Sequence, residues 1–250
     1  MTGKVWNMIK EKIAQGEKLH FSLIDPDPKK VDLVEFAGRV RRMESWGCDA
    51  VMIGGSTVDN QEFLNAVVKC VKENSTMPTI LFPGGMSGIS RYADSIYFMS
   101  LVNSRDSMWI TGIQSKAAPI LAKLRIETLP MAYVIVEPGM KAGEVGKADL
   151  IKHGENERAV GYAMSAEMSG MRLVYLEGGS GAHTPVPNEM ITSVRSALTI
   201  PLIVGGGIRN PETALEKLKA GADIIVTGTI IEGDFDKLEG IVKAVKEFGK

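Results

Sequence analysis

Eight short runs of aliphatic residues recur along the whole chain, and this recurrence constrains the fold more than any other feature. Within each run the apolar residues are continuous, which is typical of parallel strands that are covered on both faces. Each run is followed by polar residues or glycine. The predicted strands are residues 20–24, 49–53, 78–82, 95–99, 131–136, 172–176, 201–204 and 223–227.

Helical periodicity fills most of the intervals between these runs. Apolar stripes predict helices over 59–73, 188–198 and 236–248, the first of them capped by Asp59. Asn210-Pro211 predicts another helix start, because asparagine is a good N-cap and proline is favoured at the first helical position. Eight alternating units favour an α/β fold that closes into a parallel barrel. We therefore expect one (β/α)8 barrel domain of the TIM type over residues 1–250.

The interval 83–94 departs from this alternation. Its sequence, PGGMSGISRYAD, is too short and too rich in glycine for a full helix between the third and fourth strands. We predict a loop there with at most one helical turn. The barrel would then lack a regular third helix and have a gap in its outer ring.

Charge and cysteine content exclude several classes of protein. Twenty-nine basic and thirty acidic residues give a net charge of −1, which argues against nucleic-acid binding. Cys48 and Cys70 lack metal-ligand spacing and are expected to be buried free thiols. No apolar run resembles a signal peptide or is long enough to span a bilayer. We expect a soluble, cytoplasmic protein without stable insertion into a membrane.

The loops after the last three predicted strands carry the clearest functional signal. They read YLEGGSGA (175–182), GGGIRNP (205–211) and TGTI (227–230). Loops after the seventh and eighth strands form the usual phosphate site of this fold, and glycine lets backbone amides approach an anion closely. Tight turns are the structural alternative for the same glycines. Two such loops together favour a phosphate site.

Two carboxylates end strands at the same mouth of the predicted barrel. Asp25 is a candidate Mg²⁺ ligand with the Ser56 hydroxyl opposite, because Mg²⁺ binds one or two carboxylates together with substrate phosphates. The alternative is that Asp25 and Asp27 cap the next helix, which suits Asp27 better. Glu177 is a candidate partner for a substrate hydroxyl, with a salt bridge to arginine as the alternative.

Methionine and aromatic residues gather near the third to fifth strands, beside the missing helix. Core packing explains most of them, and some are candidate walls of a groove for a long apolar ligand. The set is Tyr92, Tyr97, Met99, Met108, Trp109 and Tyr133.

Taken together, these motifs resemble the geranylgeranylglyceryl phosphate synthase family, which includes bacterial heptaprenylglyceryl phosphate synthases. The resemblance covers essentially the whole chain, and LIDPD (23–27) with YLEGGSGA (175–182) is its most discriminating part. VGGGIR (204–209) and GADIIVTGT (221–229) are shared with many phosphate-binding barrels. The other markers are IGGST (53–57), LFPGG (81–85) and SLVNS (100–104).

The resemblance implies a Mg²⁺-dependent prenyltransferase of ether-lipid biosynthesis. Such an enzyme joins sn-glycerol 1-phosphate to geranylgeranyl diphosphate and releases diphosphate; the prenyl chain length stays open, and a homo-oligomer is expected. Asp25 and Ser56 match the metal positions, and Glu177 is expected to orient the attacking hydroxyl and accept its proton. The register within 205–207 is open by one residue. The positions matching the glycerol phosphate site are Tyr175, Leu176, Glu177, Gly178, Gly179, Ser180, Gly181, Gly206, Gly207, Gly228 and Thr229.

Two alternatives remain at this point. A phosphosugar isomerase of histidine or tryptophan biosynthesis shares the glycine loops, but it would place aspartates on the first and fifth strands, and the fifth strand here ends with Glu137. A non-catalytic sensor of a phosphate ligand is the other. Exchange of Asp25 would hardly change ligand affinity in such a sensor, whereas it would abolish turnover in a synthase.

Overall fold

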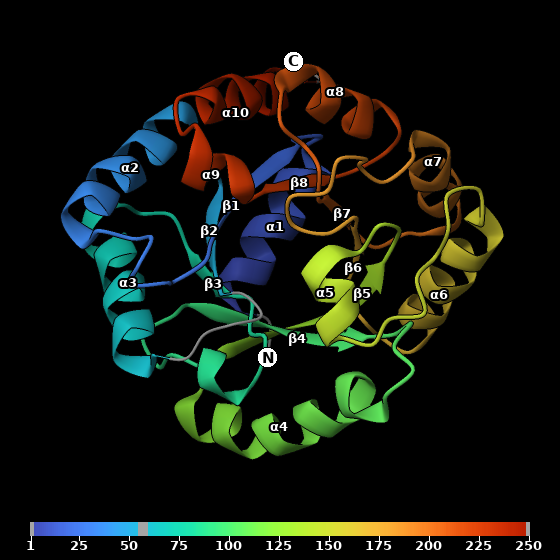
Figure 1. Cartoon of the computed structure of the whole chain (residues 1–250), viewed down its shortest axis with the longest axis horizontal. Coiled ribbons are helices and arrows are strands. Elements are labelled where there is room, and N and C mark those ends of the chain that lie inside the picture. The colour runs from blue at the N-terminus through green and yellow to red at the C-terminus, as the bar shows by residue number, and fades with distance from the viewer. Residues whose placement is uncertain (1–2, 55–59, 249–250) are drawn as a thin grey trace.

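The protein is a closed barrel of eight parallel strands, seen in a computed structural model that describes residues 3–54 and 60–248. The strands pair in chain order, and β8 returns to pair with β1 (Figure 1). All eight predicted strands are confirmed, with ends that differ by a few residues. They are β1 (Leu19–Ile24), β2 (Ala50–Ile53), β3 (Thr79–Leu81), β4 (Ser95–Leu101), β5 (Glu127–Ile135), β6 (Leu173–Glu177), β7 (Leu202–Gly205) and β8 (Ile224–Thr227).

Helices surround the barrel as an outer ring (Figure 1). The ring consists of α2 (Leu33–Trp46), α3 (Gln61–Asn74), α4 (Ile113–Leu124), α6 (Asn156–Met168), α7 (Asn188–Ala197), α8 (Pro211–Lys219) and α10 (Lys237–Glu247). Two short helices, α5 (Met140–Val145) and α9 (Thr229–Gly233), follow β5 and β8. None of the helices in the described ranges is long and apolar enough to cross a membrane.

The first helix, α1 (Lys4–Ala14), packs against the interior of the barrel. Its Val5 and Ile9 are buried in the same cluster as the inward-facing strand residues. Glu127, the first residue of β5, accepts hydrogen bonds from the backbone amides of Val5 and Trp6 at 2.9 and 2.8 Å. Because a carboxylate stabilises the amide end of a helix, this contact fixes α1 at the amino ends of the strands.

The third connection is short, as predicted. Between β3 and β4 the described chain forms only the 3-10 turn η1 (Met86–Gly88). The next connection begins with a π-helical turn, η2 (Met108–Gly112), which continues into α4. The outer ring therefore has no regular helix between α3 and α4.

Helix caps agree with the sequence in part. Asn210 caps α8 by accepting from the Thr213 amide at 2.8 Å, as predicted. The cap of α3 is Asn60, which accepts from the Phe63 amide, while the predicted Asp59 lies outside the described residues. Asp32 caps α2, so neither Asp25 nor Asp27 does so. Asp27 instead accepts a hydrogen bond from the Lys29 amide within a turn, and five residues separate it from the first helical residue, Leu33.

His20 is a buried histidine on β1, and its side chain does not face the barrel interior. It alternates with the inward-facing Leu19 and Phe21 and therefore faces the outer helices. Its Nε2 lies 3.0 Å from Thr227 Oγ1, and its Nδ1 has no partner among the described residues. Burial lowers the pKa of His20 to about 4. The neutral imidazole is consequently the form that the fold accommodates.

Stability should fall in mild acid because of this residue. Protonation of His20 favours the unfolded chain, so its contribution is present above pH 6.5 and is lost as the pH falls through 4. From pH 7 to pH 4 the loss amounts to roughly 3 kcal/mol. Denaturant unfolding of wild type and His20→Gln at both pH values tests this. The variant should lose markedly less stability over the interval, and equal losses in both proteins would contradict the assignment.

Candidate active site

A polar hollow lies between the loops that follow β6, β7 and β8. Ser180 Oγ and Thr229 Oγ1 lie 3.2 Å apart and link the first and last of these loops. Arg209 Nη2 donates to the Gly181 carbonyl at 2.7 Å and joins the second loop to the first. The lining residues at the loop ends are Glu177, Ser180, Gly181, Gly206, Gly207, Arg209, Gly228 and Thr229.

Two glycines of the hollow, Gly206 and Gly228, differ in whether their positions can accommodate a side chain. Gly206 has a φ of +85°, and a Cβ there would stand 2.5 Å from Glu177 Oε1. Gly228 has a φ of −126°, and its Cβ would make only ordinary contacts with Leu23 from 3.5 Å outward. A side chain at 206 would therefore distort the protein, whereas one at 228 would enter the hollow. Gly205 ends β7 against Tyr175 Oη, so the two residues that line the hollow are 206 and 207.

Within the segment 175–181, the residues that line the hollow are Tyr175, Glu177, Ser180 and Gly181. The Leu176 side chain belongs to the outer hydrophobic cluster, because alternate residues of a strand face opposite sides. The Gly178 amide donates to the Gly205 carbonyl at 3.0 Å, and the Gly179 amide donates to Glu177 Oε1 at 2.6 Å. Ser180 and Gly181 are the residues of the loop that line the hollow.

Glu177 ends β6 and is 5% exposed. It lines the polar hollow and also a second, apolar cavity. Burial raises the pKa of its carboxyl, while the Tyr175 and Tyr133 hydroxyls and the Gly179 amide act in the opposite direction. Tyr175 Oη nevertheless makes no hydrogen bond of good geometry in the described structure. The alternative prediction for Glu177 was a salt bridge with an arginine. No such salt bridge occurs among the described residues, where Arg158 and Arg195 pair with other carboxylates.

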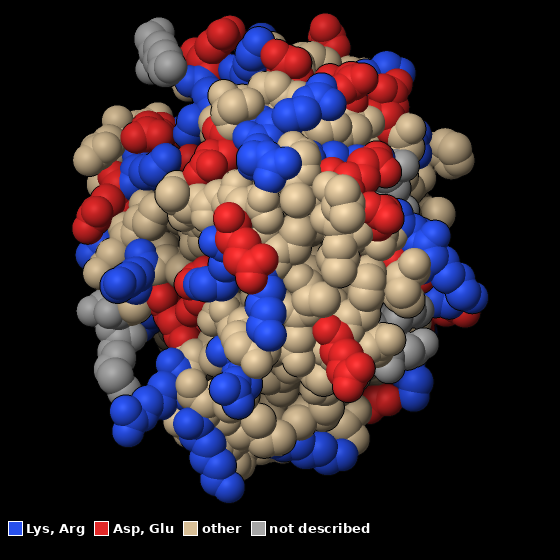
Figure 2. Space-filling view, turned by 90° about the vertical axis from the view of Figure 1, so that its left-hand side faces the viewer, with Lys and Arg blue, Asp and Glu red and all other residues tan. Residues whose placement is uncertain are grey.

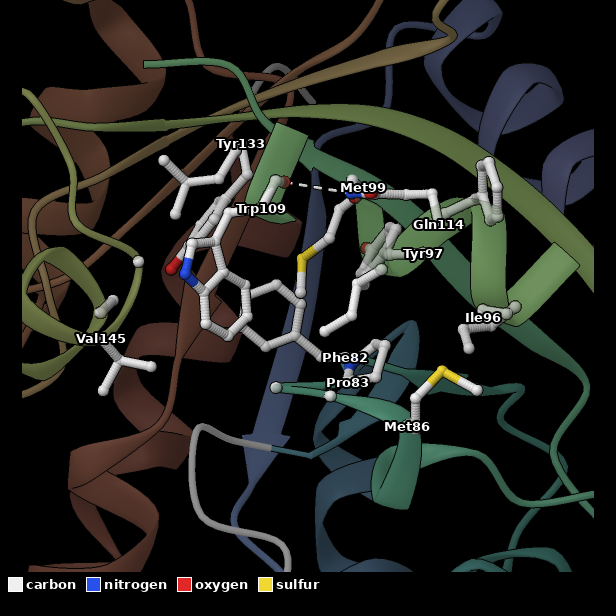
Figure 3. A pocket seen from close by; sticks show the side chains of 18 of the residues that line it. Phe82, Pro83, Met86, Ile96, Tyr97, Met99, Trp109, Gln114, Tyr133 and Val145 are labelled. Carbon is white, nitrogen blue, oxygen red and sulfur yellow. Dashed lines mark hydrogen bonds between the residues drawn. The ribbon is translucent and has the colours of Figure 1, made fainter. Parts of the chain in front are cut away.

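The apolar cavity is a groove that leads from Glu177 to the side of the barrel. It starts at Asp25, Glu177 and Ser180, and it reaches Ala117 and Leu121 of α4. Figure 3 shows Phe82, Met99 and Trp109 pointing into this space. The groove passes β3, η1 and β4, where the outer ring lacks a helix.

Aromatic rings form the inner end of the groove. Tyr133 and Phe82 lie with ring centroids 5.4 Å apart, and Tyr175 lies 5.2 Å from Tyr133. Tyr97 contacts Phe82 edge to face at 6.0 Å. Because these rings fill the barrel interior, an apolar ligand cannot descend along the barrel axis and must leave sideways.

Four of the predicted wall residues line the groove, namely Tyr97, Met99, Trp109 and Tyr133. The prediction for Tyr92 was wrong. Its ring lies on the outside of the gap, with Lys69 Nζ 4.2 Å from its centroid, because a cation attracts the face of an aromatic ring. Met108 is exposed and does not line the groove either.

Hydrogen bonds to β4 hold the start of α4 over the groove. Gln114 Nε2 donates to the Met99 carbonyl at 2.5 Å and to the Trp109 carbonyl at 3.1 Å (Figure 3). Ser100 Oγ donates to the Ile110 carbonyl at 2.7 Å. The Trp109 and Ile110 carbonyls belong to the π-helical turn and the Met99 carbonyl to β4, so these bonds tie the turn and the start of α4 to the strand beside the groove.

Asp25 follows β1 at the inner end of the groove and is half-buried. Ser56, its predicted partner, lies outside the described residues. In the ranges 3–54 and 60–248 no three His, Cys, Asp or Glu side chains gather as a metal site. A single carboxylate still fits Mg²⁺, since this ion completes its shell with substrate phosphates and water. Asp25 therefore suits a metal that arrives with a phosphorylated ligand.

Sequence reasoning missed Lys141 on α5, an exposed cation that lines the groove together with Asp25 and Glu177. No strand or glycine motif marks it, because it lies on a short helix over the mouth. Glu137, which the isomerase alternative requires, lines neither the hollow nor the groove. Its carbonyl is hydrogen-bonded by His153 instead. The geometry therefore does not favour the isomerase.

Comparisons with known proteins agree with this geometry. The sequence profile of the PcrB family matches residues 8–248. Geranylgeranylglyceryl phosphate synthase of Pyrococcus abyssi is 52% identical over 231 residues, which cover 92% of this chain and 90% of that protein. The crystal structure of (S)-3-O-geranylgeranylglyceryl phosphate synthase from Thermoplasma acidophilum, in complex with its substrate sn-glycerol-1-phosphate, superimposes with a TM-score of 0.92. It is 40% identical, and the match covers 99% of this chain and all of that one.

The contrast between the two glycines predicts different outcomes for their substitution. Gly228→Val should leave the melting temperature nearly unchanged and weaken glycerol phosphate binding at least about 10-fold, because the side chain enters the hollow. Gly206→Val should lower stability as well. Calorimetric titration with sn-glycerol 1-phosphate and thermal unfolding check both effects. Unchanged affinity in a stable Gly228→Val protein would remove this loop from the site.

Proposed function

This chain belongs to the PcrB family, and we propose that it joins sn-glycerol 1-phosphate to geranylgeranyl diphosphate through an ether bond. The reaction releases diphosphate and supplies a lipid precursor. One observation carries the proposal: the polar hollow and the apolar groove meet at Glu177. A reaction that couples a small phosphate ester to a long hydrocarbon needs both kinds of space beside one reacting centre.

The polar hollow suits the glycerol phosphate. Its phosphate would lie against the backbone of Gly206, Gly207 and Gly228, close to the Ser180 and Thr229 hydroxyls. The terminal hydroxyl of glycerol would then point toward Glu177. Binding both substrates side by side replaces a bimolecular encounter, which supplies a large part of the rate enhancement.

Glu177 is the proposed base. The bond between C1 of the prenyl group and the diphosphate oxygen breaks, and its electron pair leaves with the diphosphate. The glycerol hydroxyl oxygen bonds to C1, and its proton passes to the Glu177 carboxylate. Because burial raises the pKa of this carboxyl, it accepts a proton more readily than an exposed glutamate would.

The leaving group needs positive charge at the inner end of the groove. When bound at Asp25, Mg²⁺ would neutralise charge on the diphosphate. Lys141 would contact the same diphosphate, since it lines the same groove as Asp25 and Ser180. Its flexible side chain suits a ligand that enters and leaves in each turnover.

Incubation of the protein with sn-glycerol 1-phosphate, Mg²⁺ and a series of prenyl diphosphates tests this function, with the product lipids identified by mass. A phosphate sensor would give no product.

The same assay tests the metal: Asp25→Asn should lower turnover by roughly 100-fold or more while glycerol phosphate still binds. Wild-type turnover that persists in excess EDTA would rule out the proposed metal.

The groove predicts how chain length can be changed. Ala117 is buried and lines the groove, whereas the neighbouring Ala118 is exposed. Ala117→Trp should shorten the preferred prenyl diphosphate, because each CH2 that loses its place forfeits about 0.8 kcal/mol of burial. Ala118→Trp is the matched control and should keep the wild-type profile. Identical product distributions for all three proteins would place the prenyl chain elsewhere.

A further inference from the structure

The outer face of α4 is apolar and basic. The inner face carries the groove residues Ala117 and Leu121. On the outer face Ile120 is 42% and Leu124 38% exposed, so two large aliphatic side chains lie one helical turn apart at the surface. The exposed residues over 115–125 are Ser115, Lys116, Ala118, Pro119, Ile120, Ala122, Lys123, Leu124 and Arg125.

The charge on this face has one sign. Residues 107–126 contain Lys116, Lys123 and Arg125 and no acidic residue. The acidic residues on either side have other partners, since Asp106 pairs with Lys147 at 2.8 Å and Glu127 binds the α1 amides. Other helices of the ring, such as α2 and α10, mix acidic and basic residues. The lower edge of Figure 2, on the side of the molecule where α4 lies, likewise shows Lys and Arg around uncharged surface.

We propose that the outer face of α4 docks onto a bilayer surface that contains anionic lipids. Basic residues beside exposed aliphatic ones match such a surface, because the charges meet the headgroups and the apolar side chains enter the boundary below them. The long stems of the lysines allow the ammonium groups to stay at headgroup level. The helix lies along the interface and does not cross it.

The groove lies directly behind the outer face of α4, so docking of this face would bear on how a ligand enters the groove. Ala117 and Leu121 face the groove while Ile120 and Leu124 face outward, so the helix is a single wall between the two. Docking would therefore bring the outer end of the groove next to lipid. If the proposed function is right, a prenyl substrate and its lipid product would move between bilayer and groove over a short apolar path.

A second copy of the chain fits this face less well. Symmetric pairing places the same patch on both partners, so Lys116, Lys123 and the C-cap residue Arg125 would face three identical cations. The face carries no acidic residue to offset this repulsion. A bilayer with anionic headgroups supplies the missing charge.

Co-sedimentation of the full-length protein with vesicles tests the proposal. Vesicles of phosphatidylcholine with one third phosphatidylglycerol should bind the protein, and pure phosphatidylcholine vesicles should bind it far less. Lys116→Gln/Lys123→Gln should weaken binding by roughly 30-fold, from the usual contribution of a basic residue near an anionic surface. The matched control, Lys237→Gln/Lys243→Gln on α10, removes the same charge elsewhere and should bind like wild type.

The aliphatic pair has its own test. Ile120→Gln/Leu124→Gln should reduce binding to the same vesicles while preserving the cations. Equal binding to neutral and anionic vesicles, or an equal loss in the α10 control, would overturn the proposal. Light scattering without lipid gives a further test. If either α4 variant had a lower molecular mass than wild type, the outer face of α4 would join copies of the chain, and the proposal would be overturned. None of these measurements involves catalysis, so their failure leaves the proposed function untouched.

Discussion

Closure of the parallel sheet is the constraint on which the rest of the structure depends. Every strand runs in the same direction, so the residues that follow all eight strands meet at one mouth. Asp25, Glu177 and Thr229 are far apart in sequence, yet they border the same pair of cavities. The buried aliphatic strands give no chemistry of their own. They hold a ring of short polar loops, so that hydroxyls and backbone groups from separate loops face one hollow.

The missing third helix adds the second half of the site. A barrel packed with aromatic rings at Phe82, Tyr97, Tyr133 and Tyr175 has no room for hydrocarbon along its axis. Loss of a helix between α3 and α4 opens a lateral route instead, and Gln114 fixes α4 as its far wall. The two cavities differ in chemistry but share Glu177. A water-soluble phosphate ester and an apolar chain can therefore meet without either entering the other's environment.

The sequence allowed the barrel, the short third connection and the glycine loops at its mouth to be predicted, because each depends on local signals. Continuous aliphatic runs report burial on both faces, and glycine loops report close approach of the backbone. Other features depend on tertiary contacts that no local pattern records. Tyr92 faces Lys69 outside the gap, the Gly178 and Gly179 amides are used within the protein, and Lys141 reaches the groove from a helix that lies over the mouth. Asp32 caps α2 although DPDP is the more conspicuous start signal.

The central claim is that the two substrates meet at Glu177, and a crystal structure of a ternary complex tests it most directly. The complex would contain Mg²⁺, sn-glycerol 1-phosphate and geranylgeranyl thiodiphosphate, an analogue whose diphosphate leaves slowly. We expect the glycerol phosphate among residues 180–181, 206–207 and 228–229, and the prenyl chain along Trp109 toward Ala117. We also expect the terminal glycerol hydroxyl within hydrogen-bonding distance of a Glu177 oxygen. A hydroxyl remote from Glu177, or a prenyl chain that leaves the mouth by another route, would contradict the account.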